Sequence, residues 1–163
     1  MLTRNIYKET QSISNGSTST TITLKVPHFV VAQYIFVRDA AANDGPADNS
    51  ISNIKVSMTG RTIIDVPGKV ITYEEGFYNC AHVSDTNTRL GDNKVYTIFY
   101  GEQKPIEGYN SGGVAFSNIN NPQITVTHED PGNATHELVV VSEYLQLTNV
   151  NPDDGRVQIS YSL

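Results

Sequence analysis

The sequence contains no tryptophan, almost no cysteine and few charged residues. Of 163 residues, one is a cysteine (Cys80) and 17% are charged. A lone cysteine excludes an intramolecular disulfide framework and any multi-cysteine zinc or iron–sulfur site. No apolar run approaches the roughly 20 residues that a membrane helix needs. The first residues, Met1 to Asn5, lack the apolar stretch of a secretory signal, so we expect neither a signal peptide nor a transmembrane segment.

The balance of charge is acidic. The chain has 11 Lys and Arg against 17 Asp and Glu, which gives a formal net charge of −6. A protein that coats nucleic acid neutralises phosphates with clustered lysines and arginines. We therefore expect no direct contact with nucleic acid.

Strand-forming residues dominate the composition. Val, Ile and Thr number 16, 14 and 16, whereas Leu, Ala and Met number 7, 8 and 2. β-branched side chains fit pleated sheets and lose rotamer freedom in helices. This composition excludes a helical bundle. It also argues against a βαβ nucleotide-binding fold, because that fold needs several long amphipathic helices.

Hydrophobic alternation predicts strands along most of the chain. Every second residue from Thr20 to Val26 shares one face, which is typical of a half-buried strand. The stretch Phe29–Val37 is almost continuously apolar, as expected of a strand that is covered on both faces. Further strands are predicted over Ile6–Ser14, Ile51–Met58, Arg61–Val66, Lys94–Tyr100, Val114–Phe116, Gln123–His128, His136–Leu147 and Val157–Leu163.

Turn signals separate these strands. Thr59-Gly60 predicts a tight turn in which Gly60 takes a positive φ. One short helix is predicted over Tyr73–Cys80. Strands and turns at this spacing predict a single β-sandwich over residues 1–163, either a jelly roll or immunoglobulin-like.

Two histidines are candidates for a metal site. His128 and His136 flank one turn, with Glu129, Asp130 and Glu137 beside them. Imidazole and carboxylate groups ligate zinc, but solvated loop ends account for these residues better. We therefore predict no metal-binding and no cofactor-binding residue.

No pattern of catalytic residues is present. Glu74-Glu75 supplies paired carboxylates of the kind glycosidases use across a cleft, but no second feature supports catalysis. Asp153-Asp154-Gly155 lacks the further oxygen ligands of a calcium loop and is better explained as a turn. We predict that the protein is not an enzyme, has no small-molecule substrate and has no catalytic residue.

One segment of the C-terminal half is more specific. The stretch Phe116-Ser117-Asn118-Ile119-Asn120-Asn121-Pro122 resembles the "FSRIDNP" stretch of double-jelly-roll major capsid proteins of tailless icosahedral DNA phages and large eukaryotic DNA viruses. Asn118 stands where arginine is common in that family. The apolar strand Val139–Leu147, the turn at Asp154-Gly155 and the strand from Val157 to Leu163 are similar to the family's apolar strand, glycine-bearing turn and last strand.

The resemblance implies an all-β fold, a single eight-stranded jelly-roll β-sandwich with one short helix. The family's chains hold two jelly rolls and this chain has room for one, which points to the related single vertical jelly-roll capsid proteins. The implied function is a structural capsid protein, a subunit of an icosahedral virus or phage shell located in the virion. The implied partners are copies of itself, other capsid proteins and an internal membrane beneath the shell.

The contacts for such assembly are expected on the barrel sides and on the loops Arg38–Ser50, Ser84–Asn93 and Gly101–Gly113, since long loops in a compact domain are usually functional. The alternative is a carbohydrate-binding β-sandwich of a spike or receptor-binding protein. That alternative predicts one exposed cluster of the aromatic residues Tyr73, Phe77, Tyr78 and Tyr109.

Overall fold

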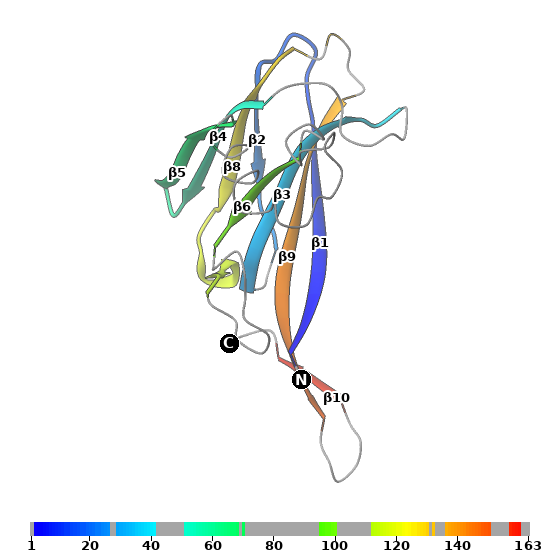
Figure 1. The fold of residues 1–163 in the computed structure, drawn as a ribbon, viewed down its shortest axis with the longest axis vertical. Coiled ribbons are helices and arrows are strands. Elements are labelled where there is room, and N and C mark those ends of the chain that lie inside the picture. The colour runs from blue at the N-terminus through cyan, green and yellow to red at the C-terminus, as the bar shows by residue number, and fades with distance from the viewer. Residues whose placement is uncertain are drawn as a thin grey trace, which may run out of the picture.

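Two antiparallel sheets pack face to face (Figure 1). The structure is a computed structural model, which describes residues 2–26, 29–41, 51–68, 70, 95–100, 112–130, 132, 136–150 and 157–160. The elements of this part of the chain are β1 (Leu2–Ser12), β2 (Ser19–Thr23), β3 (Phe29–Asp39), β4 (Ile51–Met58), β5 (Arg61–Pro67), β6 (Tyr96–Phe99), β7 (Val114–Ala115), the 3₁₀ turn η2 (Phe116–Asn118), β8 (Gln123–His128), β9 (His136–Val150) and β10 (Val157–Ser160).

The strands pair as one long ribbon folded back on itself. β4 pairs with β5, β3 with β6, β2 with β8 and β1 with β9. Two further pairings, β9 with β3 and β8 with β4, roll this ribbon into two layers. We call the layer β1-β9-β3-β6 sheet A and the layer β2-β8-β4-β5 sheet B. This winding is that of an eight-stranded jelly roll, so the predicted fold class is confirmed.

β-branched residues fill the space between the sheets. Alternate residues of each strand point inward, as the strand period of two requires. The buried apolar cluster is Ile13, Ile22, Leu24, Val26, Val30, Ile35, Val37, Ile51, Ile54, Val56, Met58, Tyr96, Ile98, Phe116, Ile124, Val126, Leu138 and Val140. The alternation that predicted these strands is therefore the alternation that builds the core.

The turn between β4 and β5 confirms one prediction and adds to it. Gly60 has φ +74°, as expected, but Thr59 also has a positive φ of 52°. Positive φ at both central residues is the pattern of a type I′ turn, whose twist matches that of the flanking strands. The residue pattern did not reveal the strained Thr59, because glycine is the usual residue in that conformation.

The segment that carries the capsid resemblance lies across one end of the sandwich. Phe116 was predicted to end a strand, but it begins η2, whose turn closes through the Ile119 N–H to the Phe116 carbonyl at 3.1 Å. The carbonyl of Pro122 then accepts a 2.8 Å hydrogen bond from the Leu24 N–H. Gly113 lies against β3, where an added Cβ would come within 2.7 Å of the Val30 carbonyl oxygen. A larger residue at position 113 would therefore push β7 away from β3.

The C-terminal strand does not join the body of the sandwich. β10 pairs with residues 147–150 at the end of β9, whereas β1 and β3 pair with β9 only as far as Leu147 and Leu145. Figure 1 accordingly shows β10 beyond the end of the sandwich, close to the N-terminus. The strand predicted over Val157–Leu163 is thus present as Val157–Ser160, in a hairpin with β9. The predicted helix over Tyr73–Cys80 lies outside the described residues.

A network of hydrogen-bonded polar side chains lies on the inner face of sheet A, among the apolar residues of the core. Gln33 and Ser142 are fully buried, and Gln33 Nε2 donates to Ser142 Oγ at 3.0 Å. Tyr100 O–H donates to Gln33 Oε1 at 2.6 Å, and the Tyr100 ring meets Phe116 edge to face. Burial raises the pKa of Tyr100, so the hydroxyl stays protonated and can donate. Because these groups satisfy one another only in this pairing of β3 with β9, the network favours that register.

Removing one hydrogen-bonding group from this network should lower the free energy of unfolding. Ser142→Ala leaves Gln33 Nε2 buried without its acceptor, so we expect the free energy of unfolding to fall by about 1–3 kcal/mol. The matched control is Thr21→Ala, which removes the exposed hydroxyl pair between Thr21 and Thr125 and should cost clearly less. Urea unfolding of both variants measures the difference. Equal losses would contradict the role given to the network.

Glu9 joins β1 of sheet A to the residues just after β2 of sheet B. Its Oε1 accepts the Lys25 N–H at 2.6 Å, while Oε2 is buried with no hydrogen-bond partner among the described residues. Burial raises the pKa of Glu9, and the donated N–H and the charge of Lys25 only partly oppose this. The ionised Glu9 carboxylate therefore links the two sheets on this side of the sandwich, but its partial burial lowers the stability of the folded state.

This cost predicts a pH dependence. A carboxyl whose pKa is raised on folding stabilises the folded state most in acid, and that contribution is lost as pH rises through the folded pKa. Glu9→Gln cannot ionise, so its free energy of unfolding relative to wild type should increase between about pH 4 and pH 7. Urea unfolding at several pH values measures the trend. Glu129→Gln, on an exposed side chain, is the control and should show a flatter difference.

Candidate assembly surfaces

The outer face of sheet B is polar, as expected of a sheet with one buried side. Its hydroxyl and amide groups hydrogen-bond across the strands: Thr21 Oγ1 lies 2.8 Å from Thr125 Oγ1, and Asn53 Nδ2 donates to Asp65 Oδ1 at 2.9 Å. The register places the following residues on this face: Ser19, Thr21, Thr23, Asn53, Lys55, Ser57, Thr62, Asp65, Gln123, Thr125 and Thr127. This face suits contact with water.

The outer face of sheet A has a different character. The register places eight apolar or aromatic residues on it, from all four strands of the sandwich: Ile6, Ala32, Tyr34, Phe36, Phe99, Val139, Val141 and Leu145. None of them except Tyr34 has a hydrogen-bonding side chain. Ala32, Val139 and Leu145 are buried although they lie outside the core cluster, and Ile6 is 73% exposed. The prediction that Phe29–Val37 has two covered faces is met in part, since outward residues of β3 are buried or half-buried.

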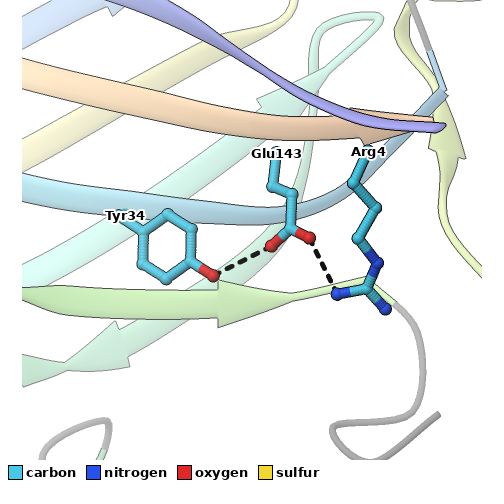
Figure 2. Close-up of polar contacts among 3 residues, drawn as sticks. All are labelled: Arg4, Tyr34 and Glu143. Carbon is cyan, nitrogen blue, oxygen red and sulfur yellow. Dashed lines mark hydrogen bonds and ion pairs between the residues drawn. The ribbon is translucent and has the colours of Figure 1, made fainter. Parts of the chain in front are cut away.

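Two ion pairs flank this apolar surface. Near one end, Arg4 Nη1 of β1 lies 2.9 Å from Glu143 Oε1 of β9, and Tyr34 O–H of β3 donates to Glu143 Oε2 at 2.9 Å (Figure 2). Near the other end, the Arg38 guanidinium contacts the Glu137 carboxylate. Each carboxylate on β9 therefore has a cation beside it, and the three long strands of sheet A are linked by side chains as well as by backbone.

The pair at Arg4 should contribute little to overall stability. The Arg4 side chain is 53% exposed, and exposed ion pairs are typically worth less than about 1 kcal/mol. Arg4→Gln should therefore lower the free energy of unfolding by less than about 1 kcal/mol, yet speed amide hydrogen exchange at the start of β1. Hydrogen exchange with mass spectrometry resolves that peptide. Unchanged exchange there would show that the pair does not anchor the strand.

The histidines are not brought together as a metal site. His128 is buried in β8 of sheet B, with Nδ1 donating to the Glu129 carbonyl at 2.7 Å and Nε2 lying 2.9 Å from the Thr20 hydroxyl. His136 begins β9 of sheet A, where its backbone pairs with Asp39. Within the described ranges no group of three or more His, Cys, Asp or Glu residues is placed to hold a metal ion. Both ring nitrogens of His128 are used to join β8 to β2 and to the turn after β8.

Most of the loops and side chains named from the sequence lie outside the described residues. These are residues 42–50 of the loop Arg38–Ser50, the whole of Ser84–Asn93, residues 101–111 of Gly101–Gly113, the paired Glu74 and Glu75, Cys80, the turn Asp153–Gly155, and the aromatic residues Tyr73, Phe77, Tyr78 and Tyr109. The described part of the chain contains no helix long and apolar enough to cross a bilayer.

The face of sheet A was the feature that sequence reasoning did not identify. Glu143 gave no signal, because its partner Arg4 is 139 residues away in the chain and only the pairing of β1 with β9 joins them. The available signal was the apolar run from Phe29 to Val37, which predicted a doubly covered strand without indicating what covers it.

With this topology, the chain has the fold of the jelly-roll viral capsid proteins. The evidence for that class comes from solved structures, because no family model and no curated protein matches the sequence. In the "PBCV-1 virus capsid, quasi-atomic model" the matched chain has a TM-score of 0.73 at 14% identity, over all of this chain. "PBCV-1 VP54 fitted into a cryo-EM reconstruction of the virophage Sputnik" gives 0.69 at 10% identity, again over the whole chain.

A phage capsid protein is also similar. The "major capsid protein P2 from Bacteriophage PM2" matches 95% of this chain with a TM-score of 0.51 at 13% identity. The chain spans about half the length of these solved chains: 51% of each of the two PBCV-1 chains and 47% of the PM2 protein. The likeness therefore extends over one jelly roll of this chain and leaves an equal length of each solved chain unmatched.

Proposed function

We propose that this protein is a structural subunit of an icosahedral virus or phage shell. The observation that supports the proposal is the jelly-roll strand order, shared over 95% or more of the chain with three solved capsid chains. The proposed role is structural and not enzymatic, as in the capsid chains that share the fold, and the buried side chains Gln33, Ser142 and His128 are used in hydrogen bonds between strands.

The proposed subunit assembles with copies of itself and with other capsid proteins. Closed shells need the same contact repeated many times, so each contact can be modest in area. The sides of the sandwich and its loops are proposed to make these contacts, whereas the net charge of −6 is unsuited to direct contact with a genome. A membrane beneath the shell is compatible with this arrangement, since the shell protein then need not contact the genome.

The composition of purified particles tests the proposal. Particles purified from the source of this sequence should contain the chain at hundreds of copies each, because shell subunits repeat by symmetry. Quantitative mass spectrometry of the particles measures the copy number, and cryo-electron microscopy of the same particles should resolve an eight-stranded density of this size in the shell. Particles that contain only a few copies, or none, would refute a shell role.

A further inference from the structure

The one Asn-Gly pair of the sequence lies in the turn between β1 and β2. Asn15 and Gly16 are the central residues of this turn, and the Ser17 N–H closes it by donating to the Ser14 carbonyl at 3.0 Å. The φ of Gly16 is +77°, whereas that of Asn15 is not positive. A positive φ at the third residue alone is the pattern of a type II turn. Asn15 is exposed, so the pair is open to solvent.

An exposed Asn-Gly pair can deamidate without an enzyme, a metal or an oxidant. The Gly16 nitrogen attacks Asn15 Cγ and forms a C–N bond that closes a five-membered succinimide ring. The bond from Cγ to Nδ2 breaks, and Nδ2 leaves as ammonia with the proton that the Gly16 nitrogen gives up. Solvent water then adds to either ring carbonyl and leaves an aspartate or an isoaspartate. Glycine favours the attack because it has no Cβ beside the attacking nitrogen.

The folded turn holds the reacting atoms apart. Ring closure requires the Gly16 nitrogen to eclipse Asn15 Cβ about the bond between Cα and the carbonyl carbon. In a type II turn the second residue has a ψ of about +120°, which rotates the next nitrogen away from Cβ. The attack therefore requires the turn to open, and opening breaks the bond from Ser17 to Ser14.

A carboxylate from a distant part of the chain holds this turn closed. Asp130 follows β8, and its Oδ1 accepts the Gly16 N–H at 3.2 Å and the Gly132 N–H at 3.0 Å. The first of these bonds fixes the nitrogen that must attack. Hydrogen bonds to a charged acceptor are stronger than neutral ones, so the loss of Asp130 removes a substantial part of what keeps the turn closed.

The flanks of the turn are fastened separately. The Ile13 N–H donates to the His136 carbonyl at 2.9 Å, and the His128 N–H donates to the Thr18 carbonyl at 3.0 Å. These bonds do not involve the Asp130 side chain. Opening of residues 14–17 is therefore a local event that leaves the strands paired, and a change at Asp130 alters this opening without altering the core.

We infer that Asn15 is a deamidation site, and that Asp130 sets its rate by holding the Gly16 N–H in the closed turn. The inference does not depend on the proposed function. The product carries a new carboxylate one residue from the N–H that Asp130 holds, and the two like charges repel each other. Deamidation therefore opposes closure of the same turn that restrained it, so that the modified turn stays open more of the time.

Deamidation rates of variants at position 130 test the inference. The proteins are incubated folded at neutral pH, and mass spectrometry of the peptide that contains Asn15 follows the loss of the amide. Asp130→Ala should raise the rate about fivefold or more, because both hydrogen bonds to Oδ1 are lost. Asp130→Asn keeps an oxygen that accepts these bonds, so its rate should stay within about twofold of wild type.

Asp65→Ala is the matched control, because Asp65 is another exposed aspartate that accepts a hydrogen bond, from Asn53 Nδ2 at 2.9 Å on sheet B. Its deamidation rate should be within about twofold of wild type. Wild type unfolded in urea gives the rate of the unrestrained pair, which should exceed that of every folded variant. Urea unfolding curves confirm that each variant is folded during the incubation.

Amide hydrogen exchange of residues 14–17 provides a second measurement. It should become faster in Asp130→Ala by about the same factor as deamidation, since both processes require the same opening. A folded wild type that deamidates as fast as the unfolded chain would overturn the inference, as would an unchanged or slower rate in Asp130→Ala. Equal acceleration by Asp130→Asn and Asp130→Ala would show that the charge of Asp130, and not its hydrogen bond, sets the rate.

Discussion

The pairing of β9 with β1 on one edge and with β3 on the other is the constraint on which the rest of the structure depends. β9 is a central strand of its sheet, and its inward residues Leu138 and Val140 belong to the core. Its outward residues make the apolar face and carry both paired carboxylates. A shift of one residue in its register would exchange these two sets, placing Glu143 in the core and Val140 outside. The buried bond between Gln33 and Ser142 opposes such a shift, because it exists in one register only.

The two sheets differ in the residues on their outer faces, although both place β-branched residues in the core. In sheet B, threonine and serine alternate with isoleucine and valine, so that one face is dry and the other wet. In β3 and β9 of sheet A most outward residues are apolar as well, and the charges on this outer face are the pairs Arg4–Glu143 and Arg38–Glu137 together with Lys8 of β1. The outward residues of sheet A are accordingly more buried than those of sheet B, with Ala32, Val139 and Leu145 all under 5% exposed.

The sequence predicted the strands of sheet B, whose outer face is polar, more completely than the strands of sheet A. β8 was predicted with its observed bounds and the β4–β5 hairpin nearly so, because alternation and turn chemistry are local. The start of β1 at Leu2 was missed, since residues 2–5 do not alternate and are strand only because β9 lies beside them. The same reason applies to the ion pairs: Arg4 and Glu143, like Arg38 and Glu137, meet through the order of strands, which no local pattern encodes. The sequence predicts a strand over Val114–Phe116, whereas the chain turns at Phe116, whose ring meets that of Tyr100 edge to face.

The partnership of the first strand with the last strand of the sandwich has a consequence during synthesis. Arg4 and Glu143 are 139 residues apart. At a translation rate of roughly 5–20 residues per second, about 7–28 s pass between the synthesis of β1 and the synthesis of its partner strand β9. Throughout this interval the backbone groups of β1 (Leu2–Ser12) that hydrogen-bond to β9 lack their partners. Nascent chains of this protein are therefore exposed to pairing with each other before they can close, and the cations Arg4 and Lys8 on that strand repel their counterparts on a neighbouring chain.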